Sequence, residues 1–241
     1  MQHQTITKVE DIVFQYPHHR EAVKELISIF REKEGVIALV FGGSVAKHME
    51  REDSDIDAMV IVTEEFYERK RKVNCIAECI SMGDCAYPGG YFDVKYMTKD
   101  YIRDAAEKGS EPTRNSFIGS HVLFSADEEV TELVRRIPVF QKQEFEEKML
   151  SFFSNLQLNY NYFWKACRPE GYMKLKVASE IVYSLYRMVL QENEILFPCN
   201  RRLEQFVKLA PDQPEHLVEY CEEFCRTLED DPLDKALEAW K

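Results

Sequence analysis

Two aspartates placed two residues apart are the part of this sequence best suited to chemistry. Asp55 and Asp57 lie where the polar segment Asp53-Ser54 runs into the apolar residues of 56–62. Alternate residues of a strand point to the same side, so these two carboxylates are expected to lie side by side. Two acids that close repel each other and need a cation. Hard oxygen ligands suit Mg²⁺, which completes its octahedron with water and substrate phosphates.

A glycine-rich turn precedes this pair and supplies the complementary half of a phosphate site. Residues 36–41 are a continuous apolar run rich in β-branched side chains, which predicts a buried strand. Gly42 and Gly43 permit backbone angles that other residues avoid, and Ser44 is expected to cap a helix starting near Val45. The free N–H groups at a helix start bind anions. A nucleoside triphosphate would meet these donors at one end and metal-bearing carboxylates at the other.

This order of strand, Gly-Ser turn, short helix and Asp-x-Asp strand resembles the nucleotidyltransferase superfamily, which includes DNA polymerase beta and the aminoglycoside nucleotidyltransferases. The match covers about residues 36–97 and rests on Gly43-Ser44 and the Asp55/Asp57 pair. The family takes a third carboxylate from a later strand. Asp93 is the candidate, because it lies within the aromatic and β-branched residues 91–97, a predicted strand where an acid needs a partner.

The resemblance implies an enzyme with two Mg²⁺ ions that uses ATP as co-substrate. An acceptor hydroxyl would attack the α-phosphorus, and pyrophosphate would leave. Asp55 and Asp57 would hold both metals, while Asp93 would hold the one on the acceptor side and is a candidate general base. Two uses remain open for Lys95, which shares the face of Asp93: it could steady a phosphate or neutralise the acids.

The phosphate-binding group is assigned to the turn and its neighbours. The residues predicted to bind the nucleotide are Gly42, Gly43, Ser44 and Lys95. Six further basic residues have two interpretations each, contact with phosphate or exposure to solvent: Lys47, His48, Lys174, Lys176, Arg201 and Arg202. Lys47 and His48 stand where family members usually carry glycine.

The hydrophobic periodicity predicts an α+β protein in two domains. Residues 1–138 are expected to form a nucleotidyltransferase domain with a mixed β-sheet flanked by helices, and residues 139–241 an all-α helical bundle. The predicted strands are 36–41, 56–62, 91–97 and 121–124, and the predicted helices of the first domain are 18–33, 64–80 and 99–108. In the second domain, helices are predicted over 141–164, 172–191 and 201–209, followed by shorter ones past Pro211 and Pro232.

The composition indicates in which cellular compartment the protein is expected and which binding partners are disfavoured. The chain has 241 residues, 45% of them hydrophobic, a net charge of −12 and seven cysteines. No run approaches the ~18 apolar residues of a membrane span, and the N-terminus does not resemble a signal peptide. An odd number of scattered cysteines fits a reduced compartment, so a cytoplasmic enzyme is expected. The acidity disfavours long nucleic acids as partners. The pairs Cys75/Cys79 and Cys221/Cys225 have helical spacing, which suits half-buried residues on helices better than zinc ligands.

Three functions are compatible with these observations. The first is transfer of a nucleoside monophosphate, AMP from ATP, to a hydroxyl of a small molecule; an aminoglycoside-like antibiotic, a polycation, would suit the acidic chain. The second is adenylylation of a partner protein, as in antitoxin-like nucleotidyltransferases that act on HEPN ribonucleases. The third is nucleotide binding without catalysis. A fused active ribonuclease is disfavoured because His216 has no arginine just upstream. The acceptor, the base preference and the oligomeric state stay open.

Overall fold

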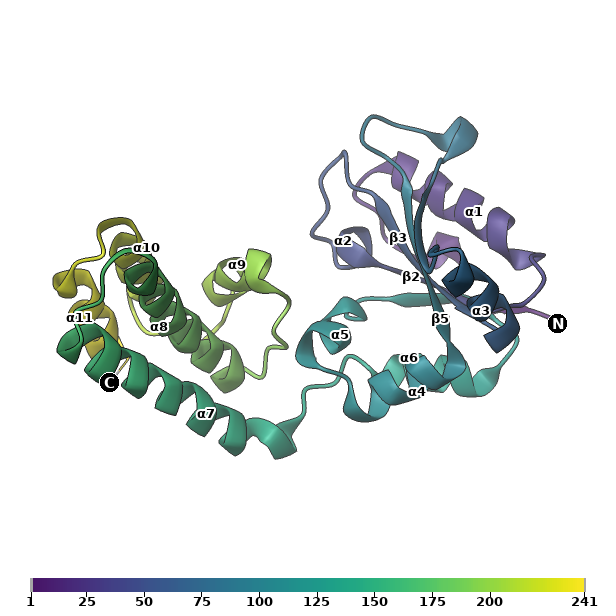
Figure 1. Cartoon of the computed structure of the whole chain (residues 1–241). Coiled ribbons are helices and arrows are strands. Elements are labelled where there is room, and N and C mark those ends of the chain that lie inside the picture. Colours follow the sequence, from purple (N-terminus) through teal and green to yellow (C-terminus); the bar gives the residue numbers. More distant parts are fainter. Residues whose placement is uncertain (1, 241) are drawn as a thin grey trace. The chain divides into compact units, whose positions relative to one another are not determined.

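The computed structural model describes residues 2–240, and these residues form two units that divide between Val139 and Phe140 (Figure 1). The N-terminal unit contains a β-sheet covered by helices, and the C-terminal unit is helical. These features confirm the predicted α+β class. Each unit is described by itself below.

The sheet of the N-terminal unit has six strands in the order β1-β6-β2-β3-β5-β4. The strands are β1 (Gln4–Thr5), β2 (Val36–Gly42), β3 (Ile56–Val62), β4 (Ala77–Ile80), β5 (Phe92–Thr98) and β6 (His121–Ser125). β3 and β5 are parallel neighbours, whereas the other paired strands run antiparallel, so the sheet is mixed as predicted. The apolar runs at 36–41 and 56–62 place β2 and β3 in the middle, where both faces of the sheet are covered.

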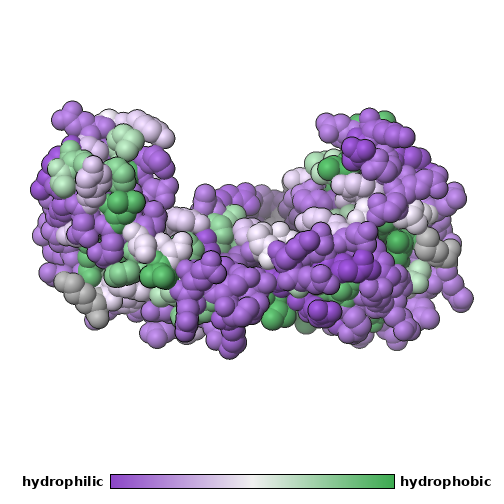
Figure 2. All heavy atoms as spheres, turned by 60° about the horizontal axis from the view of Figure 1, so that its bottom comes forward, coloured by the Kyte–Doolittle hydropathy of each residue, from purple (hydrophilic) through white to green (hydrophobic). Residues whose placement is uncertain are grey.

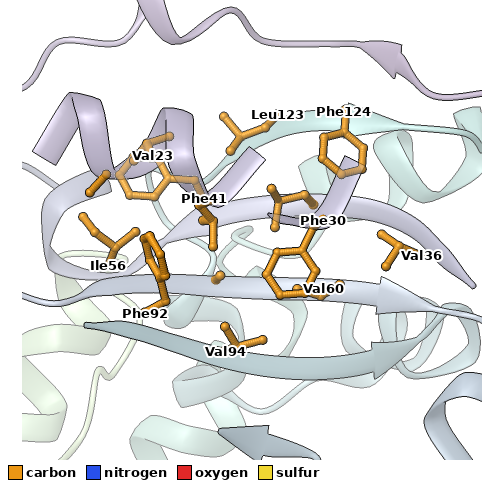
Figure 3. Packing of buried hydrophobic residues seen from close by; sticks show 14 of the residues in the cluster. Val23, Phe30, Val36, Phe41, Ile56, Val60, Phe92, Val94, Leu123 and Phe124 are labelled. Atoms are coloured by element: carbon orange, nitrogen blue, oxygen red, sulfur yellow. The ribbon is translucent and has the colours of Figure 1, made fainter. Parts of the chain in front are cut away.

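One face of the sheet is covered by α1 (Pro17–Arg31) and α3 (Glu64–Lys72). The apolar stripe of α1 buries Val23 and Phe30 against Phe41, Val60 and other side chains of the central strands (Figure 3). The ring of Phe30 lies 6.3 Å from that of Tyr96 on β5. This packing holds the strands in the register that sets the candidate site.

The opposite face is covered by α4 (Lys99–Lys108), α5 (Glu111–Ser116) and α6 (Glu128–Arg136). Each of these helices begins at a side-chain cap. Thr98 accepts a hydrogen bond from the Tyr101 N–H, Ser110 from that of Thr113, and Asp127 from those of Glu129 and Val130. A last short helix, α2 (Gly43–Ala46), follows β2 directly.

The prediction of a single helix over residues 64–80 is wrong for the second half of this segment. α3 ends at Lys72, Asn74 takes a left-handed backbone with φ 55°, and residues 77–80 form the edge strand β4. Cys79 is therefore on a strand and not on a helix, while Cys221 and Cys225 do lie on a helix. The helical pattern that led to this prediction comes from the charged residues of α3. A strand of only four residues at the edge of a sheet leaves no comparable pattern in the sequence.

The C-terminal unit packs its helices around a single apolar core. Its elements are η3 (Lys142–Glu144), α7 (Phe145–Gln157), η4 (Leu158–Ala166), α8 (Gly171–Glu192), η5 (Asn200–Arg202), α9 (Leu203–Lys208), α10 (Leu217–Thr227) and α11 (Asp230–Ala239). The helix predicted over 141–164 is an α-helix only as far as Gln157, and then continues as the π-helix η4. α8 agrees with the helix predicted over 172–191 and buries the most residues of the unit.

The surface is mainly hydrophilic on the face seen in Figure 2, with apolar patches between the hydrophilic regions. This agrees with a chain in which 31% of residues are charged. Within residues 2–240, no helix is both long and apolar enough to cross a membrane.

Candidate functional site

A row of residues across three strands forms the centre of the candidate site. Gly42 on β2 is the register partner of Asp57 on β3, and Asp57 is the register partner of Asp93 on β5. Register partners on adjacent strands point to the same face of a sheet. Two of the three carboxylates predicted from the sequence are therefore direct neighbours, although they are far apart in the chain.

Lys95 joins these two carboxylates. Its ammonium group donates to Asp93 Oδ2 at 2.7 Å and to Asp57 Oδ1 at 3.2 Å. Burial raises the pKa of Asp57, the Lys95 charge opposes this, and the charges of Asp55 and Asp93 add to the rise. Burial alone would lower the pKa of Lys95, but its bonds to Asp93 and Asp57 reverse this and raise it. The ammonium thus pairs with both acids, and its contact with a phosphate stays a prediction.

Asp55, the third predicted carboxylate, is held differently. It precedes β3, and its interaction with the Tyr91 phenol raises the pKa of that group. Within residues 2–240, no three His, Cys, Asp or Glu side chains are gathered closely enough to hold a metal ion. The three acids are near enough to affect one another's charge, and Lys95 lies between Asp57 and Asp93.

The donor set nonetheless has the chemistry that a divalent cation requires. Asp57 is surrounded by two other acids in a half-buried position, and one ammonium group compensates them only in part. Carboxylate oxygens are the ligands that Mg²⁺ prefers. These residues fit a divalent metal in charge and in donor type.

The glycine turn is fitted closely to Asp57. Gly43 has φ 73°, and a Cβ placed on it would lie 1.8 Å from Asp57 Oδ2. A Cβ on Gly42 would lie 2.6 Å from the terminal methyl of Met59. The Gly43 position therefore excludes a side chain, which brings the backbone of the turn against the carboxylate, whereas at Gly42 only the end of the Met59 side chain would have to move.

Ser44 does not cap the helix as predicted. Gly42 occupies the N-cap position of α2, no side chain caps this helix, and Ser44 is its second residue. The difference arises because β2 continues through Gly42 and the helix begins at once, two residues earlier than predicted. Ser44 still lies on the turn that contacts Asp57 through Gly43.

Two segments that the sequence did not single out support α2. Lys47, at the end of α2, donates to the side-chain oxygen of the buried Asn115 on α5 at 3.0 Å. Gly119 packs on the other side, since a Cβ there would lie 2.7 Å from the Ala46 carbonyl oxygen. No local sequence signal marks Asn115, because it belongs to a helix of six residues.

A cluster of aromatic side chains fixes the loop that carries Asp55. The Tyr87 hydroxyl donates to the Ser54 carbonyl at 2.6 Å, and the His18 ring bonds the Glu52 carbonyl at 2.9 Å. The rings of His18 and Tyr87 are 4.3 Å apart. Burial, with a contribution from the Asp55 charge, raises the pKa of Tyr87 to about 12, so its hydroxyl remains a donor. No sequence pattern indicates that Tyr87 holds this loop.

The basic residues considered in the C-terminal unit have local contacts. Lys174 lies over the Trp164 ring at 5.5 Å, Lys176 pairs with Glu180 and Arg202 donates to Gln205. Their contact with phosphate stays a prediction, as does that of Arg201.

Comparison with known proteins adds independent information on the N-terminal unit. No match was found among curated proteins. Among solved structures, a nucleotidyltransferase-like protein from Exiguobacterium sibiricum 255-15 is similar, with 10% sequence identity and a TM-score of 0.46 over 91% of this chain and 72% of that chain. The family model of the nucleotidyltransferase domain matches residues 23–110, which include β2, α2, β3 and β5. Residues 23–110, a little over a third of the chain, therefore carry the match to the nucleotidyltransferase domain.

Proposed function

We propose that the protein is a metal-dependent nucleotidyltransferase that moves AMP from ATP to a hydroxyl group of a small molecule. The observation that carries this proposal is the in-register pair of Asp57 and Asp93, placed directly beside the Gly43 turn. The family match over residues 23–110 supports nucleotidyl transfer as the reaction class.

In this reaction an acceptor oxygen forms a bond to the α-phosphorus of ATP, and the bond from that phosphorus to the β-phosphate oxygen breaks. Pyrophosphate carries away the bonding electrons, and the acceptor loses its proton. Asp93 is the proposed general base, because its carboxylate is partly exposed on the face shared with Asp57. Gly42, Gly43 and Ser44 are proposed to bind the leaving phosphates through backbone N–H groups.

Asp55, Asp57 and Asp93 would hold the two Mg²⁺ ions. When bound, these ions would neutralise the charge that develops on the attacking and leaving oxygens. Lys95 keeps Asp57 and Asp93 at a fixed spacing by bonding both carboxylates. Tyr91 orients the Asp55 carboxylate through its hydroxyl.

The acceptor is proposed to be a hydroxyl-bearing cation of the aminoglycoside type, since the chain carries a net charge of −12. Attraction of a positively charged substrate by an acidic surface raises its local concentration. The proposed place of action is the cytoplasm, in keeping with seven cysteines that are all free thiols.

Pyrophosphate release tests the proposal. The purified protein is incubated with ATP, Mg²⁺ and a panel of aminoglycosides and lincosamides. Substitutions Asp57→Asn and Asp93→Asn are expected to lower the rate by at least about a thousandfold. Asp53→Asn is the matched control, because Asp53 is an exposed acid of the same loop that pairs with Arg51. It should leave the rate unchanged.

The remaining functions are separate outcomes of this experiment. Label from ATP found on a partner protein, with no small molecule active, would replace the proposed acceptor by a protein. The salt bridges of Lys95 favour a second candidate, a nucleotide-binding domain without catalysis, because they already compensate two of the acids. ATP binding without pyrophosphate release from any acceptor would favour that candidate. Release that survives both substitutions would contradict the assigned site.

A further inference from the structure

The C-terminal unit contains a cavity of its own, built from α8, η5, α9 and the end of α10. Its volume is about 540 Å³, within the range of about 300–1,000 Å³ that is typical of small-molecule sites. The lining residues on which the argument below depends are Glu180, Tyr183, Tyr186, Leu203, Glu204 and Leu228. The whole lining belongs to the C-terminal unit.

The lining combines an apolar body with negative charge. Aliphatic side chains and the rings of Tyr183 and Tyr186 provide most of the wall, and the described lining includes two carboxylates, Glu180 and Glu204, and no basic side chain. Burial, together with nearby groups that include Glu204, raises the pKa of Tyr186, so its hydroxyl stays neutral. Aromatic faces and carboxylates together attract organic cations.

The two carboxylates have basic partners that are not part of the lining. Glu180 pairs with Lys176 at 3.1 Å and Glu204 with Lys208 at 2.9 Å. All four of these side chains are exposed, and each pair is of the i,i+4 helix type. Exposed pairs of this kind are weak, so a bound cation can share the carboxylates without a large penalty.

Leu228 is an unusual feature of the cavity wall. It ends α10 in a left-handed conformation with φ 55°, a position that glycine usually occupies. Its side chain lines both this cavity and a second one of about 400 Å³ that includes Trp164, Lys174 and Asp230. A leucine held in a disfavoured conformation between two cavities points to a use for its side chain at this position.

We propose that this cavity binds a small organic cation with an apolar body, such as an aromatic amine. The apolar part would lie against Tyr183, Leu203 and Leu228, and the ammonium group would face Glu180 and Glu204. The proposal rests on the lining of this cavity alone and not on the proposed nucleotidyl transfer.

Three probes of similar shape and different charge test this proposal on the full chain. They are 1-naphthylmethylammonium, 1-naphthylmethanol and 1-naphthoate, with binding measured by titration calorimetry. We expect the ammonium probe to bind most tightly, the alcohol less and the carboxylate least. Added salt should weaken binding of the ammonium probe and not of the alcohol.

Two glutamates that share one lysine provide a matched pair of variants. Glu204 and Glu222 both pair with Lys208, at 2.9 and 2.6 Å, but only Glu204 is part of the lining. Glu204→Gln is expected to weaken binding of the ammonium probe by about fivefold, the effect of about 1 kcal/mol. Glu222→Gln should leave it unchanged, and both variants should keep the wild-type circular dichroism spectrum.

Three results would overturn the proposal. These are the absence of saturable binding by the ammonium probe, equal binding of all three probes, and an equal loss of binding in Glu204→Gln and Glu222→Gln. None of them bears on nucleotidyl transfer, which is measured by pyrophosphate release.

Discussion

Asp57 is the central residue of the candidate site, because four other groups are arranged around its carboxylate. It touches the backbone of Gly43, bonds Lys95 and feels the charges of Asp55 and Asp93. A buried acid near other acids is a poor choice for stability, since its folded pKa is raised. Sites of this kind usually trade stability for chemistry.

The stability of the N-terminal unit should therefore improve when this charge is removed. Because the pKa of Asp57 is raised on folding, its ionisation costs stability as pH rises above the unfolded value of 3.8. Asp57→Asn is expected to raise the melting temperature at pH 7 while abolishing activity. A melting temperature below that of the wild type would contradict the electrostatic account; Asp53→Asn, in the same loop, should not change it.

Gly43 allows a sharper test of the contact between turn and carboxylate. Gly43→Ala would add backbone strain at φ 73° and a Cβ that overlaps Asp57 Oδ2. The displaced carboxylate should lower kcat/KM by about a hundredfold or more. Gly83→Ala is the control, because Gly83 also has a left-handed backbone, φ 56°, with no atom within 4 Å of its Cβ position. Equal effects of the two substitutions on activity would show that strain alone is responsible.

The Tyr87 hydroxyl is expected to act through the loop that carries Asp55. Tyr87→Phe removes the hydrogen bond to the Ser54 carbonyl, worth about 1 kcal/mol. Binding of Mn²⁺, followed by electron paramagnetic resonance, should weaken by about fivefold, because the loop is less well held. The control is Tyr101→Phe, an exposed tyrosine of α4. Unchanged Mn²⁺ binding in Tyr87→Phe would assign this tyrosine to packing alone.

Among the elements, those with a strong apolar pattern were predicted best. The spacing of apolar residues identified β2, β3, β5 and α8 to within a residue or two, and Asp57 and Asp93 lie on partly exposed positions of β3 and β5. The pairing of β3 with β5 could not be read from the sequence, because it depends on contacts between segments far apart in the chain. The bridging by Lys95 follows from that pairing.

Elements held by tertiary contacts were predicted poorly. β4 is an edge strand of four residues whose register is set by β5, and α5 is a single short helix anchored by Arg114, which donates to the carbonyls of Ala106 and Ile137. α6 had a readable signal in Asp127 followed by Glu128 and Glu129, which is a helix start that the sequence prediction did not use. The π-helix η4 has no sequence rule of this kind.

The start of α11 gives a prediction for the helical unit. The Asp230 carboxylate is bonded by Arg168, Trp164 and Lys165. These contacts, that of Arg168 first, lower the pKa of this carboxyl from 3.8 to about 2. Because the folded pKa is depressed, the stabilisation is present above pH 3.8 and is lost as pH falls towards 2. Since Asp230 is partly exposed, Asp230→Asn should cost only about 1 kcal/mol at pH 7.

Tryptophan fluorescence suits this measurement, since the Trp164 ring nitrogen donates to Asp230 at 2.7 Å. Urea unfolding at pH 7 and at pH 2 should show the difference between wild type and Asp230→Asn shrinking at the lower pH. Asp231→Asn is the control, because Asp231 is the next residue of α11 and pairs with Lys235 rather than with Arg168 or Lys165. A difference that persists at pH 2 would exclude the ionic origin.

For the whole molecule, charge is the property with the plainest consequence. Acidic residues number 43 and basic residues 31, and the basic ones are largely paired with acids, as in the bridges of Lys99 and Lys208. We therefore expect no retardation of single- or double-stranded DNA or RNA in a mobility-shift assay at low salt, where electrostatic binding is strongest. Retardation that disappears with added salt would reveal a basic surface and reopen nucleic acid as a substrate.

The parallel pairing of β3 and β5 also determines when the site can form during folding. β2 and β3 are antiparallel neighbours close in the chain, so their hairpin brings Gly43 to Asp57 through local closure. Asp93 joins only after the intervening α3 and β4 have been traversed and β5 docks on β3. The mutual repulsion of the acids opposes this closure, which is longer in range than that of β2 with β3, and Lys95 lies on the same strand as Asp93 and offsets it. The positive charge of Lys95 therefore reaches the site in the same step as the negative charge of Asp93 that it compensates.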